Sequence, residues 1–423
     1  MHTRRLLVVP AVVVGALVAQ AGLASPAHAA GPRFASPAGT SAQNCLTPAT
    51  ACNIEKAINS ASSGDDITIL PGTYTTATVL TRTVTNLNIH GEAGRPRPVI
   101  NSTASAAISF PQSATGVKVS DLVINHSGSQ YGLNLFTTGV LVQRVEVHSS
   151  GPVACSPGIS GVVRDSLCVT TTSQTGGIAL DDSWGGGTGK LVLRNVTAIA
   201  TGAGSYGIRA DADGSNTNLD IDARNVIASG AAADVRSTLR AGSTNLDSDV
   251  VLQNSNYDLA EVGTGGFVTA AGTGTNQKTA PVFADASYHQ ARTSPTINAG
   301  ATDASTGTLD LDGEARPYQG VMDIGADEFY PDVTPPDTIL GHGPKRRSHK
   351  RRAVFLFSAT EPATFLCKVD RNKRHSCTSP LKKRFKRYGR HKITITAIDD
   401  SGNVDPTPVT YRWRIKKKRH HHR

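Results

Sequence analysis

The stretch from Val119 to Val147 has the sequence VSDLVINHSGSQYGLNLFTTGVLVQRVEV. Short aliphatic runs stand at both ends, and the residues between them are rich in Gly, Ser, Asn and Thr. Alternating apolar and polar residues between such turn formers predict β-strands and not helices. Related runs recur from residue 64 to 257, and they align on Leu122, Val145, Leu167, Val196 and Val226, at steps of 23, 22, 29 and 30 residues.

A second series of apolar positions lies between the members of the first. It consists of Gly132-Leu133, Gly158-Ile159, Gly177-Ile178, Gly207-Ile208 and Asp234-Val235. A repeat of roughly 20–30 residues is typical of a solenoid, in which each turn buries its apolar side chains only by stacking on its neighbours. We therefore expect an all-β chain with a parallel β-helix of about eight turns. An antiparallel sandwich is the alternative fold, but it would show turn residues every 8–12 residues or so.

The first turn of a β-helix needs a cap, because its edge would otherwise be open. The segment Asn53-Ile54-Glu55-Lys56-Ala57-Ile58 predicts a short amphipathic helix with Asn53 as its N-cap. This helix could close the first turn, and a Cys45–Cys52 bridge would hold it there.

Several segments resemble a known family. IEKAINSASSGDDITILPGTYT (54–75), NLNIHGEAG (86–94) and PVIN (98–101) resemble the start of secreted right-handed parallel β-helix proteins of the pectin-lyase-like superfamily. SPTINAG (294–300) and DLDGEARPYQGVMDIGADEF (310–329) resemble the end of its choice-of-anchor branch. Together the resemblance covers about residues 43–330. It implies the fold more strongly than a reaction, because the superfamily contains polysaccharide lyases, hydrolases and proteins without a known activity.

Polysaccharide lyases of this superfamily typically use an Arg or Lys base together with acidic residues that hold calcium. A uronate substrate needs its carboxylate neutralised while a base removes the neighbouring proton. Here GIALDD (177–182) aligns with GIRADAD (207–213) at an offset of 30 residues, which places Asp181 over Asp211 with Arg209 beside them. Asp181, Asp211 and Arg209 are the candidate catalytic residues, and the two carboxylates are the candidate calcium ligands.

The candidate carbohydrate contacts are Asp182, Asp213 and Trp184, whose indole could stack on a sugar ring. Each of these residues also has a structural interpretation. The Asp residues could instead accept backbone N–H groups in turns, and Trp184 could cover the edge of the core. No contiguous catalytic motif of the family is present, which leaves enzymatic activity open, and calcium is the one candidate cofactor.

Asp310-Leu311-Asp312-Gly313 resembles part of a calcium loop, but it lacks a third acidic residue at regular spacing and the final Glu. We favour a structural role, in which Arg316 pairs with Asp323 or Glu328 to hold the last segment. His126 and His148 follow equivalent strands, 22 residues apart. They could be ligands on one edge, but we favour a solvated pair.

The N-terminal residues predict export. Arg4 and Arg5 precede an apolar run, which ends in Ala27-His28-Ala29, the pattern of a secretory signal peptide cleaved after Ala29. Residues 30–42 are expected to be disordered. No other run is long and apolar enough to cross a membrane. In an exported chain the six cysteines predict three local disulfides, Cys45–Cys52, Cys155–Cys168 and Cys367–Cys377.

Charge divides the chain at a Pro-rich linker, residues 331–336. Residues 332–423 contain 24 Lys and Arg against 7 Asp and Glu, a net charge of +17, whereas residues 1–331 carry −7. SATEPATFLCKVD (358–370) and ITITAIDDSGNVDPTPVTYRW (393–413) resemble bacterial Ig-like modules, so a small β-sandwich is expected over residues 337–415, followed by a basic tail, residues 416–423. Its basic runs, residues 345–352 and 382–387, attract polyanions.

These features favour a secreted or wall-associated monomer that binds extracellular or cell-wall polysaccharide. In this interpretation the basic module attaches the protein to a polyanion. Nucleic acid is a weaker candidate, because no nucleic-acid motif is present and the chain is exported. A lyase acting on an acidic polymer and an architectural spacer are the alternatives.

Overall fold

The computed structural model describes residues 30–158, 160–182, 189–212, 218–239, 247–272 and 274–417. The chain forms two compact units, Met1–Glu328 and Phe329–Arg423. Their boundary lies next to the predicted Pro-rich linker. Among the described residues, no helix is long and apolar enough to cross a bilayer.

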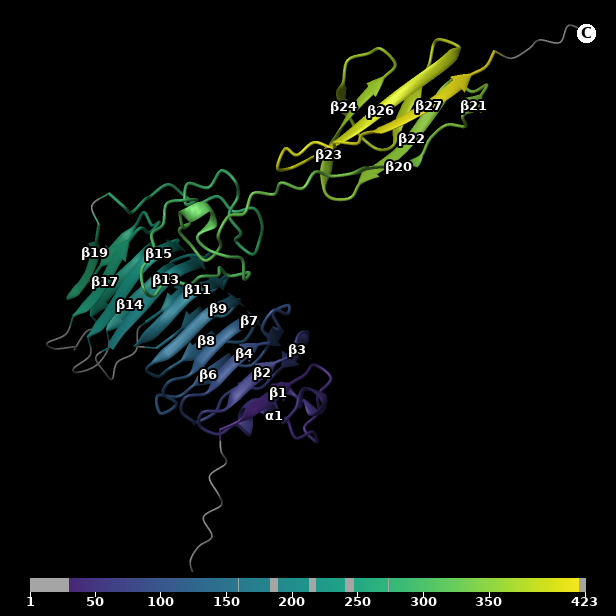
Figure 1. Cartoon of the computed structure of the whole chain (residues 1–423). Coiled ribbons are helices and arrows are strands. Elements are labelled where there is room, and N and C mark those ends of the chain that lie inside the picture. The colour runs from purple at the N-terminus through teal and green to yellow at the C-terminus, as the bar shows by residue number, and fades with distance from the viewer. Residues whose placement is uncertain are drawn as a thin grey trace, which may run out of the picture. The chain divides into compact units, whose positions relative to one another are not determined.

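The first unit is a right-handed parallel β-helix, as the sequence predicts. Strands of successive turns pair in parallel and lie side by side (Figure 1). Its larger sheet consists of β1 (Pro32–Ala35), β2 (Asp66–Ile69), β4 (Asn88–Gly91), β7 (Lys118–His126), β9 (Val140–Ser149), β11 (Gly161–Thr170), β13 (Gly189–Ala200), β15 (Leu219–Gly230), β17 (Ser248–Gln253) and β19 (Gly266–Ala270), with β3 (Thr73–Thr76) and β5 (Val99–Ser102) alongside.

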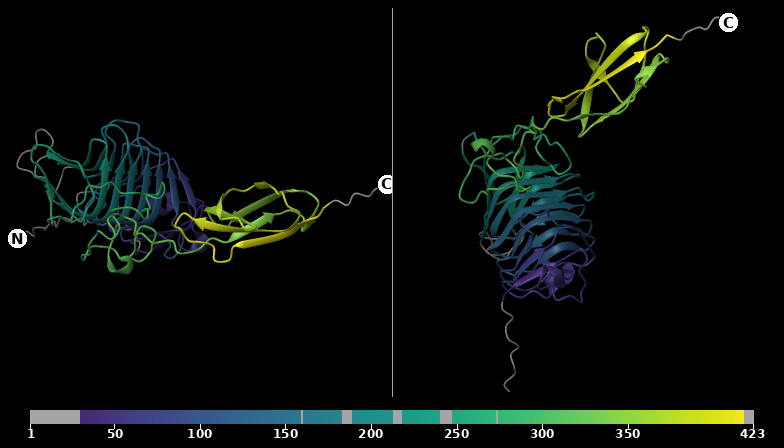
Figure 2. Two further views of the ribbon diagram at one scale, coloured as in Figure 1. Left: turned by 90° about the horizontal axis from the view of Figure 1, so that it is seen from above. Right: turned by 45° about the vertical axis from the view of Figure 1, so that its right-hand side comes forward.

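The second sheet closes each turn on another side of the helix. Its strands are β6 (Ala106–Phe110), β8 (Tyr131–Leu135), β10 (Val153–Ser156), β12 (Ile178–Asp181), β14 (Tyr206–Ala212), β16 (Ala233–Leu239) and β18 (Ala260–Val262). Figure 2 shows the turns stacked as parallel rungs. Each strand pairs with the equivalent strand of the next turn. Strand edges with unpaired backbone N–H and C=O groups are therefore confined to the two ends of the β-helix.

Each long strand of the larger sheet bends at one residue with a left-handed backbone. These residues are Asp121, Arg144, Asp165, Asn195 and Asn225, and Asn254 has the same conformation directly after β17; φ lies between 48° and 57°. Asp and Asn tolerate this conformation better than other non-Gly residues. The bend turns the second half of the strand toward a new side, so residues both before and after it reach one interior.

That interior is a column of aliphatic side chains. Leu122, Val145, Val196 and Val226 are all buried in it, and the pairs Leu122–Val145 and Val196–Val226 are in register. Four of the five positions in the first predicted series are therefore confirmed as members of the core.

Leu167, the fifth position, is displaced by one residue. Ser166 pairs with Val196, and Leu167 pairs with Thr197. A shift of one residue moves a side chain to the other face of a strand. Leu167 therefore points out of the helix, where it packs with Ile199, Ile227 and residues of the chain beyond the last turn.

The second predicted series is partly wrong. Leu133, Ile208 and Val235 occupy the inward position, but the turns between them are aligned by Cys155 and Leu180. Ile178 pairs with Tyr206, two residues away from the predicted match, and Ile159 lies outside the described residues.

The N-terminal cap is present. The helix α1 (Ile54–Asn59) begins at Asn53, whose side chain accepts the Lys56 N–H, and it buries Ile54, Ala57 and Ile58. The expectation of disorder over residues 30–42 is wrong, because β1 pairs with β2 and Arg33 forms a 2.7 Å ion pair with buried Asp65. A charged partner just before the next strand, which local composition does not reveal, fixes this segment.

Residues 274–328 form the closing segment, which contains few regular elements, among them the 3₁₀ turn η2 (Tyr318–Gly320). It covers one face of β11, β13 and β15 (Figure 1). There Leu311, Ile324 and Ala326 pack on the outward side chains of Leu167, Ile199 and Ile227. Both faces of these strands are therefore buried.

All three predicted disulfides are formed: Cys45–Cys52, Cys155–Cys168 and Cys367–Cys377. A second short turn, η1 (Pro48–Thr50), lies within the first loop. Such bonds are typical of proteins that fold outside the cytoplasm.

The second unit is a small domain of two sheets. One sheet has the order β20 (Thr338–His342), β22 (Arg352–Ala359) and β25 (Leu381–Arg384), and the other has β21 (Arg347–Ser348), β27 (Val409–Ile415), β26 (Gly389–Asp399), β23 (Ala363–Val369) and β24 (His375–Cys377). Its core includes Phe355, Trp413, Ile393 and the third disulfide.

Candidate functional site

The predicted stack of Asp181 on Asp211 does not form. Asp181 is in register with Arg209, and Asp211 with Thr238. The offset between β12 and β14 is thus two residues shorter than predicted. A shift of two residues preserves the inward–outward alternation, so the pattern of apolar residues could not distinguish the two alignments.

Instead of facing each other, the carboxylates alternate with guanidinium groups. Arg209 contacts Asp181 through Nε and Nη2, both at 3.0 Å, and its Nε lies 3.7 Å from Asp211. Arg236 continues the row, with contacts of 3.3 Å to Asp211 and 3.1 Å to Glu261. The row therefore contains its own counter-charges, and it does not leave two carboxylates facing a vacancy for calcium.

Arg209 is poorly suited to act as a base. Burial lowers its pKa, but the charges of Asp181 and Asp211 outweigh that effect and raise the pKa above its ordinary value. A general base needs a pKa near the working pH. The geometry therefore gives Arg209 a structural ion-pair role and does not support proton abstraction.

Asp182 is only 2% exposed, so it cannot contact a polymer on the surface. Neither of its carboxyl oxygens has a hydrogen-bond partner. Burial, followed by the neighbouring charge of Asp181, raises its pKa well above the ordinary value. The predicted sugar contact of Asp182 is wrong, while Trp184 and Asp213 lie outside the described residues.

The two histidines thought to be equivalent face opposite ways. His148 pairs with Asn125, and His126 pairs with Ser149. His126 is buried, with its ring nitrogens 2.9 Å from Ser149 Oγ and 3.0 Å from the Ala104 carbonyl oxygen, and burial lowers its pKa. His148 points outward and bonds to Glu146 at 2.6 Å.

The Asp310 loop has the structural role that we favoured. Asp310 accepts backbone N–H groups from Asp312, Glu314 and Glu328, so its carboxylate is directed into the loop and not at a cation. Arg316 is buried and bonds to Glu328 at 3.1 Å, and it also contacts the backbone carbonyl oxygen of Asp323 at 3.5 Å. Its second carboxylate partner is Asp165 of β11, at 3.3 Å, which the sequence did not indicate.

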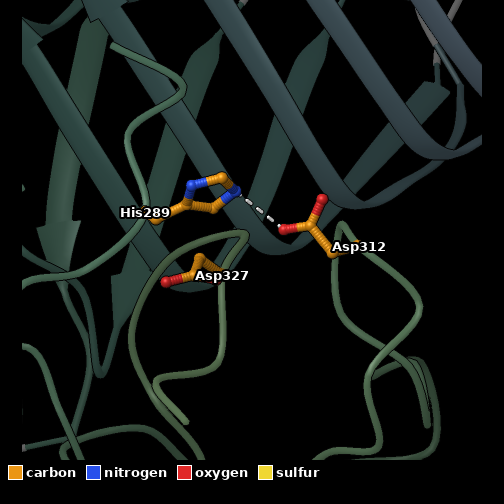
Figure 3. A group of neighbouring side chains, drawn as sticks. All are labelled: His289, Asp312 and Asp327. Carbon is orange, nitrogen blue, oxygen red and sulfur yellow. Dashed lines mark hydrogen bonds and ion pairs between the residues drawn. The ribbon is translucent and has the colours of Figure 1, made fainter. Parts of the chain in front are cut away.

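A cluster of acidic and imidazole groups lies where the closing segment meets the β-helix. His289, Asp312 and Asp327 each bring one ligand-type atom within 4.8 Å of the others (Figure 3). His289 bonds to Asp312 at 2.9 Å and to Asp285 at 2.6 Å. Arg97 links the cluster to β9, because it contacts both Asp312 at 2.9 Å and Glu146 at 3.1 Å.

Hydrogen bonds and burial shift the pKa values of the groups in this cluster. The hydrogen bond to Asp312 raises the pKa of His289 to about 10 in spite of its burial. Burial raises the pKa of Asp327 to about 7. His289, Asp285 and Asp327 were not predicted, since loop residues carry no periodic pattern. The available cue was that Asp312 and Asp327 both belong to the terminal motif, residues 310–329.

The C-terminal domain carries a cationic face, defined here as Arg347, Arg390, Lys392, Arg412 and Arg414. All five are exposed on the outer side of the sheet formed by β21, β27 and β26. Arg414 lies opposite both Arg390 and Arg347, and Arg412 lies opposite Lys392. The alternate residues, such as His391 and Trp413, point into the core.

A hollow with a cavity volume of about 1060 Å³ adjoins the cationic face. Eight Lys or Arg residues line it, together with Tyr388, His391, Trp413, Asn372 and Asp370. Asp370 is the one acid among these described lining residues, and it is occupied, because it bonds to His391 at 2.8 Å and to the Lys392 N–H at 2.9 Å. The hollow is therefore strongly positive.

Comparisons with known proteins give little further information. No protein-family model matches the chain, and no curated protein matches it. Among solved structures, the crystal structure of pectate lyase Pel9A is similar over 71% of this chain and 96% of its own, with 13% sequence identity and a TM-score of 0.38. The assignment of a parallel β-helix rests on the strand pairing described above.

Proposed function

We propose that this is an exported protein that binds an anionic extracellular or cell-envelope polysaccharide through the cationic face of its C-terminal domain. The β-helix would supply a rigid body with additional polar contacts for glycan. Binding to polysaccharide is the role expected from the sequence, and the cationic face would make the main contact.

The pairing of like charges across neighbouring strands is the observation that carries the proposal. Arg414 opposite Arg390, and Arg412 opposite Lys392, are arrangements that destabilise a sheet, because opposed side chains lie about 5 Å apart. Among the residues that the structure describes, none of the five cations of this face forms an ion pair with a carboxylate. A bound polyanion would relieve this repulsion.

The arrangement of the charges supports a repeating ligand. Arg412 and Arg414 share one side of β27, which places them roughly 7 Å apart along the strand, with the opposed cations of β26 roughly 5 Å away. This grid offers several points of attachment to a polymer with regularly spaced charges. Four of the five groups are guanidiniums, which bind carboxylate, sulfate or phosphate oxygens in pairs.

The β-helix contributes a polar groove on β3, β5, β7 and β9. The groove has a cavity volume of about 250 Å³ and is lined by Thr75, Asn101, Thr103, Asn125 and His148, among others. Amide, hydroxyl and imidazole groups of this kind hydrogen-bond to sugar hydroxyls. We propose it as a weaker glycan contact.

The three disulfides support export, and the predicted signal peptide agrees with it, although residues 1–29 lie outside the described residues. The lyase alternative has less support. Its proposed base, Arg209, is held between Asp181 and Asp211, and Asp182 is buried.

The test is a binding panel with the full chain on immobilised polymers: polygalacturonate, a sulfated glycan, poly(glycerol phosphate) and neutral dextran. We expect binding to the acidic polymers and none to dextran, with affinity falling steeply as salt rises, because surface charges are screened. The double variant Arg390→Ser and Arg412→Ser should lose at least tenfold in affinity.

A charge-matched control uses the outer side of the other sheet. Lys382→Ser and Arg384→Ser remove the same net charge at exposed positions of β25. If the control weakens binding as much as the face variant, net charge and not the cationic face determines attachment. Equal binding to dextran, or binding that does not change with salt, would contradict the proposal.

A further inference from the structure

The cluster of His289, Asp312 and Asp327 in the closing segment has the donors of a metal site. His289 supplies an imidazole nitrogen, and Asp312 and Asp327 each supply a carboxylate oxygen, with all three atoms within 4.8 Å of one another. The three residues come from separate parts of the closing segment, and Figure 3 shows His289 bonded to Asp312 with Asp327 beside the imidazole ring. No group in the cluster depends on the cationic face, so this inference is independent of the proposed function.

Each of these three donors is oriented by a residue outside the set. Asp285 bonds to Nδ1 of His289 at 2.6 Å, which directs Nε2 toward Asp312. Arg97 holds Oδ1 of Asp312 at 2.9 Å and leaves Oδ2 facing His289. The Gln290 N–H holds Oδ2 of Asp327 at 2.6 Å. Outer partners of this kind are typical of metal sites, where a carboxylate fixes the orientation of a histidine ligand.

The burial of the donors differs in a way that suits a bound ion. Asp327 is 8% exposed, and His289 and Asp312 are partly open to solvent. One wall of the site is thus dry, while an ion could enter from the other side. Among the described residues, no Lys or Arg pairs with Asp327, and the charge of His289 only partly offsets the cost of its burial. An ion would supply further positive charge.

We propose that His289, Asp312 and Asp327 bind one Zn²⁺ ion. One imidazole and two carboxylates form a mixed nitrogen and oxygen set, which suits zinc better than calcium, because calcium prefers six to eight oxygen ligands. On binding, the ion replaces the hydrogen between His289 Nε2 and Asp312 Oδ2, and that proton is released to solvent. Three protein ligands leave one position of a tetrahedral zinc open to water.

Zinc at this position would link distant parts of the closing segment. The loop containing Asp285 and His289, the loop containing Asp312 and the strand-free stretch at Asp327 would share one ion. Through the contacts of Arg97 to Asp312 and to Glu146 of β9, the ion would also strengthen the attachment of the closing segment to the β-helix.

The test is calorimetric titration of the chelator-treated full chain with ZnCl₂, together with thermal unfolding in the same samples. The background protein carries Asn in place of His420, His421 and His422, because a run of histidines binds zinc by itself. We expect one Zn²⁺ per chain, a higher melting temperature with zinc, and no comparable effect of Ca²⁺. Asp312→Asn and Asp327→Asn, which preserve side-chain shape, should weaken binding at least tenfold.

Two further variants separate the roles. Asp285→Ala tests the positioning of His289 and should weaken zinc binding by about 10- to 100-fold without changing the stoichiometry. His90→Ala is the matched control, since His90 is also bonded to a carboxylate, Asp66, at 3.1 Å, and it should bind zinc as the background does. The proposal is wrong if no zinc binds, or if Ca²⁺ binds as tightly as Zn²⁺. It is also wrong if Asp312→Asn and Asp327→Asn keep the circular dichroism of the background and bind zinc with unchanged affinity.

Discussion

Asp182 is the residue whose energetics are most unusual in the β-helix. It follows Leu180 and Asp181 at the end of β12, and it lies in a buried position with no hydrogen-bond partner for either carboxyl oxygen. Because its pKa is raised in the folded state, the unfolded chain loses this proton first as the pH increases. The group therefore destabilises the fold increasingly above about pH 4, where the unfolded carboxyl ionises.

Asp182→Asn should remove this effect. Relative to the wild type, the free energy of unfolding of the variant should increase between pH 4 and pH 7 by at least about 1.4 kcal/mol, the value of one pKa unit. Urea unfolding of both proteins at several pH values measures this difference, and other titrating groups cancel in it. A difference that stays constant with pH would show that the Asp182 carboxyl is not shifted.

Arg316 shows the opposite situation, a buried charge with several partners. It bonds to Asp165, Glu328 and the carbonyl oxygens of Gly325 and Ala326. Arg316→Ala should lower the free energy of unfolding by about 3–5 kcal/mol, since it leaves two buried carboxylates without their cation.

Arg95→Ala is a suitable comparison, because Arg95 is exposed and lies 3.8 Å from exposed Glu92. It should change the free energy of unfolding by less than about 1 kcal/mol. Denaturant unfolding of the two variants checks both values, and a small effect of Arg316→Ala would contradict the proposed role of this residue in holding the closing segment.

At the scale of the strand, the recurring left-handed bend shapes the β-helix. Asn225 occupies it in β15, where its side-chain amide donates to Asn195 Oδ1 and to the Ala301 carbonyl oxygen, each at 2.8 Å. The same residue thus satisfies the backbone geometry and joins the preceding turn to the closing segment.

Substitutions at Asn225 separate these two contributions. Asn225→Gly loses the hydrogen bonds but keeps a residue that adopts positive φ freely, whereas Asn225→Ala adds a backbone penalty of about 1–2 kcal/mol. We expect Ala to be the less stable variant by roughly that amount in urea unfolding. Equal stability of the two would mean that the bend carries no strain.

The strands and their stacking could be predicted from the sequence, but the register could not be predicted throughout. At Leu167 both faces of β11 are buried, so apolar residues no longer mark the inward side. At Ile178 a two-residue displacement left the alternation intact. The second ambiguity produced the incorrect stacking of Asp181 on Asp211, since that prediction depended on the alignment of β12 with β14.

Among the remaining site residues, the sequence predicted those in runs of basic residues and did not predict those brought together by folding. The basic runs, residues 345–352 and 382–387, were recognised as a polyanion-binding feature from charge alone. The cationic face depends instead on Arg390, Arg412 and Arg414, which belong to strands whose pairing sets them side by side. The cluster at His289 depends on loops that meet only after folding, so the terminal motif that contains Asp312 and Asp327 did not reveal that His289 joins them.

At the scale of the whole molecule, two units of opposite charge form one chain. Residues 1–331 have a net charge of −7, and residues 332–423 a net charge of +17. The acidic unit has internal ion pairs along its β-helix, whereas the cations of the C-terminal face have no carboxylate partner among the described residues. An anionic ligand is therefore expected at the C-terminal domain.

Chemical labelling of lysines tests this claim most directly. Lys392 belongs to the cationic face, and Lys382 lies on the outer side of the other sheet; both are exposed. Acetylation of each can be followed by mass spectrometry in the full chain, with and without a short acidic oligosaccharide at saturating concentration. We predict that the ligand slows acetylation of Lys392 several-fold and leaves Lys382 unchanged, and protection of both lysines to the same degree, or of neither, would contradict the account.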